Sequence, residues 1–119
     1  MLTKVRKGLE VEGPAFLHVF APCPRGLRSE PAKTMDYSKL AVESCVFPVW
    51  EAVNGKRQLS IPSKLIALAP QKKKPVKDYL VGQGRFRHLF TPQNQHVIDE
   101  IQRATDERWQ RLLQKCEPT

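Results

Sequence analysis

Three cysteines, Cys23, Cys45 and Cys116, are the residues of this sequence with the greatest capacity for metal or redox chemistry. A thiolate can ligate zinc or iron or form a disulfide. None of the three belongs to a C-x-x-C pair, and the three histidines are also scattered, so the spacing indicates no closed four-ligand zinc site within the chain. An odd number of distant cysteines likewise argues against a secreted disulfide framework.

Cys23 differs from the other two in its setting, the stretch HVFAPCPRG at residues 18–26. It follows an apolar run, and the prolines on either side restrict the backbone around it. Open α/β sheets place ligands just beyond the carboxyl ends of such strands. On these residues alone a ligand and a packed thiol remain equally favoured for Cys23. Cys45 and Cys116 lie on predicted apolar helix faces, and we expect both to pack as small hydrophobic residues.

No catalytic motif accompanies the cysteines. The sequence has no GxSxG, P-loop or HExxH pattern, and the stretch GQGR holds only two glycines. The carboxylate pairs Asp99–Glu100 and Asp106–Glu107 fall on the predicted polar side of the last helix, where we expect solvation and not acid–base catalysis. The sequence therefore argues against a self-contained enzyme.

Composition indicates one globular domain with a basic surface. The chain has 119 residues, of which 40% are hydrophobic and 27% charged, and its formal net charge is +8. A basic excess favours acidic partners, but no aromatic residues are interleaved with the bases as a nucleic-acid stacking platform requires. We expect solvated faces, and for Lys72–Lys77 a solvated linker rather than a docking site for an acidic protein. Without an apolar run of membrane-spanning length or a signal peptide, a cytoplasmic location is expected.

Residues 1–69 are predicted to hold a strand, a cysteine loop and a hairpin. A helix over residues 2–11 precedes the stretch PAFLHVFAP, which is apolar on both faces and is therefore predicted as a buried strand, with His18 as a hydrogen-bonded strand residue. An irregular loop over residues 22–36 then leads to a short helix capped by Asp36 or Ser38. The dipeptide Asn54-Gly55 predicts a type I′ turn between two strands, with Pro48 and Pro62 limiting their extent.

Residues 70–119 are predicted to hold the basic linker and terminal helices. A short helix should place Val76, Tyr79 and Leu80 on one face and break at Gly82 and Gly84. Thr91-Pro92 should begin the last helix. This helix carries an amphipathic stripe that needs a cover from the domain's own sheet or from a partner. The stripe consists of Ile98, Ile101, Thr105, Trp109, Leu112 and Cys116. The expected class is α+β.

Three segments carry a resemblance to a known family: EGPAFLHVFAPCPRG, PAKTMDYSKLAVESCVFPVWE and KPVKDYLVGQGRFRHL. Over residues 2–90 the chain resembles the carboxyl-terminal part of the beta subunit of 2-oxoacid:ferredoxin oxidoreductases, the pyruvate synthase family. The resemblance implies a fragment of a thiamine-diphosphate-binding α/β fold. It also implies one 4Fe–4S cluster near the thiamine, with three cysteine ligands upstream and the fourth in an APCP loop. Cys23 is thus the implied fourth ligand.

The chain also departs from the family pattern, because two of its motifs are missing. The chain lacks the upstream CxxC and the GDG motif that binds diphosphate and magnesium, so the resemblance assigns those sites to a missing part of the subunit. Met1 falls inside the expected helix, which suggests a truncated chain, a fragmentary gene or a split subunit. We expect this chain to be inert alone.

The resemblance also implies a reaction and its partners. The family converts a 2-oxoacid to an acyl-coenzyme A, passing electrons to ferredoxin. The implied partners are the rest of the beta subunit, the alpha subunit, the other subunits and ferredoxin. The alternative is a small basic, non-catalytic interaction module that binds an acidic protein or nucleic acid.

Overall fold

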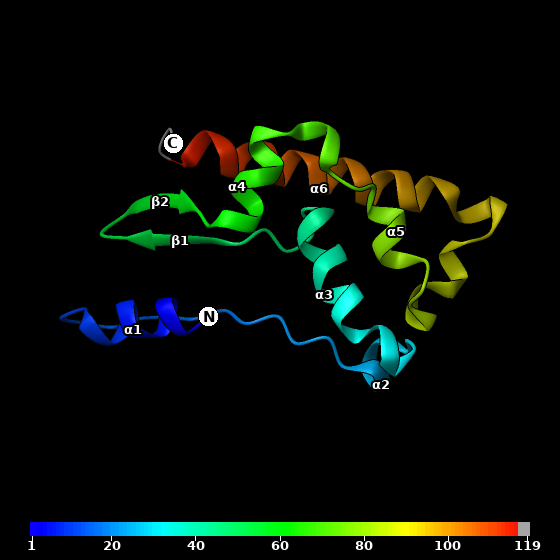
Figure 1. Ribbon diagram of the computed structural model, residues 1–119. Coiled ribbons are helices and arrows are strands. Elements are labelled where there is room, and N and C mark those ends of the chain that lie inside the picture. Colours follow the sequence, from blue (N-terminus) through cyan, green and yellow to red (C-terminus); the bar gives the residue numbers. More distant parts are fainter. Residues whose placement is uncertain (117–119) are drawn as a thin grey trace.

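The computed structural model describes residues 1–116, in which helices pack along the carboxyl-terminal helix α6 (Gln95–Lys115). A hairpin lies at one end of this body, and helix α1 (Leu2–Glu10) lies outside it, joined to the body by an extended segment (Figure 1). The principal extents of 51 × 30 × 22 Å reflect this elongated arrangement. Within the described residues, no helix is long and apolar enough to span a membrane.

The chain forms the following elements between α1 and α6. They are α2 (Pro24–Leu27), the 3-10 turn η1 (Pro31–Lys33), α3 (Thr34–Glu43), β1 (Trp50–Val53), β2 (Lys56–Leu59), α4 (Ile61–Leu68), the 3-10 turn η2 (Pro70–Lys72), α5 (Val76–Leu80), and the 3-10 turns η3 (Gly84–Leu89) and η4 (Pro92–Asn94). Helices together with a two-stranded sheet agree with the expected α+β class.

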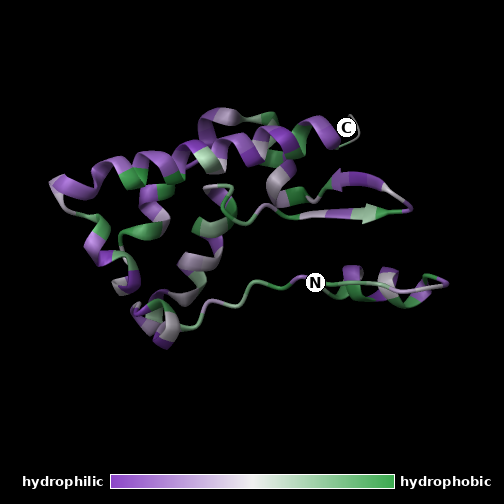
Figure 2. Ribbon diagram, turned by 180° about the vertical axis from the view of Figure 1, so that it is seen from behind, coloured by the Kyte–Doolittle hydropathy of each residue, from purple (hydrophilic) through white to green (hydrophobic). Residues whose placement is uncertain are grey.

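The predicted stripe of α6 is covered by this chain's own helices. Trp109 packs with Cys45 and Ile66 in one apolar cluster, and Ile101 packs against a second cluster. The second cluster contains Ala41, Val76, Tyr79 and Leu80. The polar side of α6 faces outward in Figure 2. Helices α3, α4 and α5 therefore cover much of the stripe, and Leu59 of β2 adds to the Trp109 cluster.

The predicted hairpin is confirmed. Strands β1 and β2 pair antiparallel, with Val53 opposite Lys56, so Asn54 and Gly55 form a two-residue turn. Their φ angles of 51° and 80° are the positive values that a type I′ turn requires. The short helix α5 is confirmed as well, with Val76, Tyr79 and Leu80 buried.

The predicted buried strand at residues 14–22 is wrong for this chain. The segment is extended but pairs with no strand among residues 1–116, and Phe16 is 90% exposed. A strand forms only when neighbours satisfy its backbone groups, and the hairpin lies elsewhere. His18 is exposed too, with its ring centroid 5.1 Å from that of Phe47, and is not a buried, hydrogen-bonded strand residue.

Residues 22–36 are more ordered than the predicted loop. They form α2, η1 and the start of α3, which begins at Thr34, upstream of Asp36 and Ser38. Thr91 precedes η4 without a side-chain cap, and α6 begins only at Gln95. Helix α4 was not predicted, because Pro62 was assigned to the end of a strand although proline also favours the first turn of a helix.

The lysine run is exposed at Lys72, Lys74 and Lys77, but two of its lysines also contact the helical body. Lys73 pairs with Asp106 of α6. Lys74 pairs with Glu43 at 2.8 Å, and its backbone N–H donates to the Glu43 carbonyl at 2.9 Å. Two of these lysines therefore hold the segment between α4 and α5 against α6 and α3.

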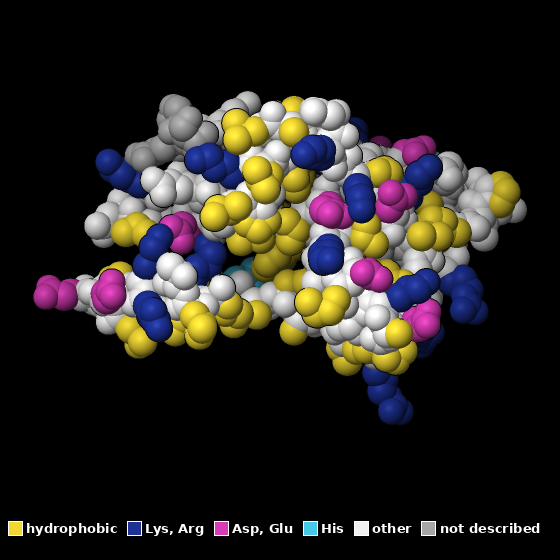
Figure 3. All heavy atoms as spheres, viewed as in Figure 1, with side chains coloured by type: hydrophobic (Ala, Val, Ile, Leu, Met, Phe, Trp, Pro, Cys, Tyr) yellow, Lys and Arg dark blue, Asp and Glu magenta, His cyan; other side chains and the backbone are white. Residues whose placement is uncertain are grey.

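Helix α1 is held to the hairpin by charged groups. The Lys4 ammonium donates to Glu51 Oε2 at 3.2 Å and to Ser60 Oγ at 2.7 Å, and Lys7 pairs with the other Glu51 oxygen. No residue of α1 is buried, and its apolar side chains line its outer edge in Figure 3. The ionised Glu51 carboxylate thus contacts both lysines that hold α1, and Ser60 adds a further contact to Lys4.

We predict that Glu51→Gln releases α1. A nine-residue helix is too short to persist alone in water, so circular dichroism at 222 nm should decrease and hydrogen exchange over residues 2–10 should accelerate. Hydrogen bonding from Lys7 chiefly lowers the Glu51 pKa below its ordinary 4.5, so this stabilisation is present above pH 4.5 and is lost as the pH falls through the lowered pKa. Glu10→Gln, which removes a charge outside this contact, is the control. Unchanged exchange in the Glu51 variant would contradict the prediction.

Candidate functional site

Cys23 lies at the N-cap position of α2, with its side chain exposed. Pro24 occupies the first turn, where its fixed φ angle suits a helix and its missing N–H costs nothing. The Leu27 N–H donates to the Cys23 carbonyl at 2.9 Å and closes the turn. The thiol is therefore accessible on a short, conformationally restricted loop.

Arg28 connects this cysteine loop, residues 23–28, to the body. Its φ of 52° is left-handed, and its carbonyl accepts a 2.9 Å hydrogen bond from the Gly84 N–H. A Cβ added to Gly84 would lie 2.7 Å from the Arg28 Cβ, closer than real side chains approach. Only glycine permits this approach, so Gly84 fixes where the cysteine loop lies.

Gly82 makes the matching contact with α3. The Tyr37 hydroxyl donates to the Gly82 carbonyl at 3.0 Å, and Tyr37 is buried. A Cβ at Gly82 would collide with this hydroxyl and lie 2.9 Å from Cζ of the same ring. The two glycines of GQGR therefore have a packing role, which the sequence interpretation did not identify.

Cys45 is buried, whereas Cys23 is exposed. Cys45 is 2% exposed and packs with Ile66 and Trp109, so the packing prediction is confirmed. Burial raises the pKa of its thiol to about 11, with Lys73 acting in the opposite direction and Asp106 in the same one. Its φ of 61° terminates α3, a position where glycine is usual.

The remaining candidate ligands are not brought together. Cys116 is half-buried at the end of α6, where burial raises the pKa of its thiol. Within residues 1–116 no three histidine, cysteine or acidic side chains lie close enough to hold a metal ion. Cys23 therefore stands alone as a potential ligand on its loop.

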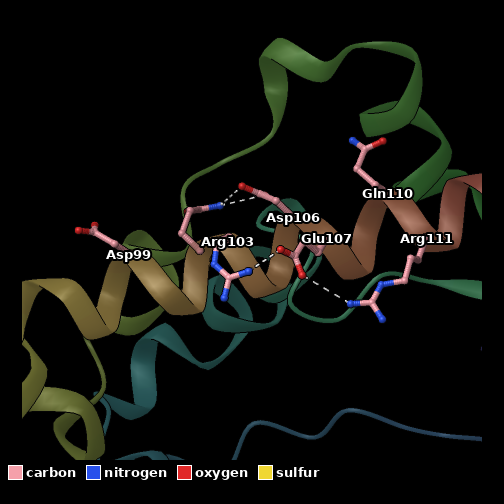
Figure 4. A pocket seen from close by; sticks show the side chains of 7 residues that line it. Asp99, Arg103, Asp106, Glu107, Gln110 and Arg111 are labelled. Atoms are coloured by element: carbon pink, nitrogen blue, oxygen red, sulfur yellow. Dashed lines mark hydrogen bonds and ion pairs between the residues drawn. The ribbon is translucent and has the colours of Figure 1, made fainter.

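Three carboxylates of α6, namely Glu100, Asp106 and Glu107, pair with bases, two of them beside an open pocket on the helix surface. Arg103 pairs with Glu107 at 2.5 Å (Figure 4) and with Glu100 at 2.7 Å. Asp106 pairs with Lys73. Arg103 chiefly lowers the pKa of Glu100 by donating a hydrogen bond to it. The pairs of Arg103 are exposed, in agreement with the predicted solvated face, whereas the Lys73 side chain of the Asp106 pair is only 18% exposed.

Comparison with known proteins identifies relatives, although no protein-family profile matches the chain. Pyruvate synthase subunit PorB of Thermotoga maritima is 41% identical over 111 residues, which cover 92% of this chain and 32% of that protein. Ketoisovalerate oxidoreductase subunit VorB of Pyrococcus abyssi is 35% identical over 117 residues, covering 98% of this chain and 34% of that protein. PorB of Methanosarcina barkeri is 38% identical over 111 residues, with coverages of 89% and 34%.

These matches confirm the resemblance found in the sequence. The relatives are subunits of oxidoreductases. The chain is related to the PorB and VorB subunits of pyruvate synthase and ketoisovalerate oxidoreductase, and it spans about a third of the length of the curated relatives it matches.

We predict that Gly82→Ala destabilises the fold by about 2 to 4 kcal/mol, because the added methyl group overpacks Tyr37 and breaks its hydrogen bond. Urea denaturation measures the loss. Gly26→Ala is the matched control, since a Cβ there has no neighbour nearer than 3.9 Å. Equal stability of the two variants would show that the Gly82 contact is not required.

We also predict that iodoacetamide labels Cys23 first and Cys45 last. At pH 8 a thiol with a pKa of about 11 is ionised in about one molecule in a thousand, and burial further hinders attack on Cys45. Mass spectrometry of timed samples gives the order. Raising the pH towards 11 should accelerate labelling of Cys45 relative to Cys23. Labelling of Cys45 at the rate of Cys23 at pH 8 would contradict the predicted order.

Proposed function

We propose that this chain is the carboxyl-terminal part of the beta subunit of a 2-oxoacid:ferredoxin oxidoreductase. The observation that carries the proposal is the 41% identity to a pyruvate synthase subunit over 92% of this chain. A ketoisovalerate oxidoreductase subunit is nearly as similar, so the proposal is limited to 2-oxoacids as the substrate class. The chain acts within a complex and is inert alone.

Cys23 is the residue that we assign to the chemistry, as one ligand of a 4Fe–4S cluster. Such a cluster takes four cysteine thiolates, and each ligand must be accessible and held in position. The exposed Cys23 thiol, at the N-cap of α2, meets both requirements for one of the four ligands. Residues 1–116 hold no group of three potential ligands, and we assign the other three ligands to the part of the subunit that this chain does not span. When bound, the cluster would carry single electrons from the thiamine site towards ferredoxin.

Thiamine diphosphate and magnesium do not fit this chain's own residues. The GDG motif is missing, and no carboxylate cluster within residues 1–116 could hold a metal ion. We therefore assign these cofactors to the rest of the beta subunit. The part of this chain is to present Cys23 and to pack against the other subunits.

The extended segment between α1 and α2 is the surface that we assign to the rest of the beta subunit. Over residues 14–22 its side chains are apolar on both faces apart from His18, and Phe16 is 90% exposed and Val19 50% exposed. A segment of this kind is stable when strands flank it and layers cover both faces. The curated relatives are about three times as long, so the corresponding part of the subunit is long enough to supply such a sheet.

We predict that anaerobic reconstitution with iron and sulfide gives broad iron–sulfur absorbance when this chain is produced together with the remaining part of the subunit. Cys23→Ser should abolish or strongly reduce that absorbance, because serine replaces one of the four thiolates. Cys116→Ser is the matched control, since Cys116 packs at the end of α6.

Two results would refute the assignment of Cys23. One is the absence of any iron–sulfur absorbance with the remaining part present and co-purifying. The other is a cluster of equal yield and equal electron paramagnetic resonance spectrum after Cys23→Ser.

A further inference from the structure

A cavity of about 170 Å³ lies where the cysteine loop meets the turn between α5 and η3. It is lined by two arginines, two glycines, a glutamine and two apolar residues, namely Arg28, Arg87, Gly82, Gly84, Gln83, Val81 and Phe90. Arg28 and Arg87 are far apart in the sequence. The hydrogen bond from Gly84 to the Arg28 carbonyl brings their segments together.

Two polar side chains beside this cavity, Gln83 and Arg85, have hydrogen-bond partners within the chain. Gln83 is 1% exposed, donates to the Tyr79 carbonyl at 2.6 Å and accepts from Arg85 Nε at 2.8 Å. The Arg85 guanidinium also lies 4.5 Å from the centre of the Phe86 ring. Gln83 and Arg85 are therefore occupied by this chain's own groups.

Arg28 and Arg87 have no such partners. Neither guanidinium forms an ion pair within residues 1–116. The ion pairs found there involve lysines of α1, lysines near η1 and η2, and arginines of α6. Two arginines without an ion pair among residues 1–116 therefore line one cavity. An anion in the cavity could pair with both guanidiniums.

We propose that this cavity binds a phosphate group, held by the Arg28 and Arg87 guanidiniums. The planar guanidinium presents paired N–H donors that match the oxygens of a phosphate, and a dianion can balance both arginines. The volume suits one phosphate group, and the rest of a larger ligand would lie outside. This site is separate from cluster ligation by Cys23 and does not require it.

The test is a titration of the full chain, without a cluster, with inorganic phosphate and with pyrophosphate at low ionic strength. Proton–nitrogen correlation spectra report the amides of Gly82 and Gly84, which lie in the cavity wall. We expect saturable shifts at both amides. Arg28→Gln and Arg87→Gln should each weaken binding about tenfold, because each removes one guanidinium fork. Tighter binding of pyrophosphate would indicate a phosphoryl group of a larger ligand, and equal binding would indicate free phosphate.

Arg108→Gln is the matched control, because Arg108 is an exposed arginine of α6 that does not line the cavity. It removes the same charge and should change the affinity less than about twofold. Arg28→Lys keeps the charge but loses the fork, and should weaken phosphate binding while leaving the fold intact. Retained dispersion of the Gly82 and Gly84 signals verifies folding of each variant.

Three results would overturn the proposal: no saturable shift, equal weakening by Arg108→Gln, or acetate binding as tightly as phosphate. Failure here would leave the cluster assignment standing, since that assignment is read from iron–sulfur absorbance. Loss of the cluster assignment would equally leave phosphate binding measurable.

Discussion

The turn between α5 and η3 lies very close to α3 and to the cysteine loop, and the candidate site depends on these two contacts. The Gly82 carbonyl accepts a hydrogen bond from the Tyr37 hydroxyl of α3. The Gly84 N–H donates a hydrogen bond to the Arg28 carbonyl at the end of the cysteine loop. Both approaches are too close for a Cβ. The position of the Cys23 loop relative to the helical body is therefore set by the absence of two side chains, and the cavity between Arg28 and Arg87 arises from the same approach.

The segment between α1 and α2 lacks any comparable constraint over most of its length. Phe20 stacks near Phe47, with ring centroids 5.4 Å apart, and this contact joins the segment to a core cluster. Before it, Phe16 and Leu17 meet solvent, and α1 beyond them is held by lysines that reach Glu51. Apolar side chains on both faces of unpaired backbone are a pattern suited to the interior of a sheet. The chain thus carries a self-covered body and an amino-terminal arm whose composition suits contact with more protein.

The sequence predicted those elements whose causes are local. Asn54-Gly55 specified the hairpin through its backbone preferences, and the stripe on α6 specified its buried face through spacing alone. The strand at residues 14–22 failed because a strand also requires neighbours, which composition cannot supply. Packing glycines and cavity walls were missed for a similar reason: Arg28 and Arg87 meet through a tertiary contact, so no spacing in the sequence relates them. The flanking prolines distinguish Cys23 in the sequence, but its proposed role as a ligand comes from the family resemblance.

The environments of Cys23 and Cys45 show what the structure adds to a count of thiols. Ligation requires the thiolate, and burial that raises the pKa of Cys45 to about 11 makes its deprotonation costly at neutral pH. Its apolar neighbours Ile66 and Trp109 would also have to separate before a metal could approach. Cys23 is exposed, so no apolar neighbours have to separate before a metal approaches, and the Leu27 N–H and the Gly84 contact restrain its backbone. Accessibility with restraint is the combination that a ligand needs when the remaining ligands come from another stretch of polypeptide, since it limits the entropy lost when the site assembles.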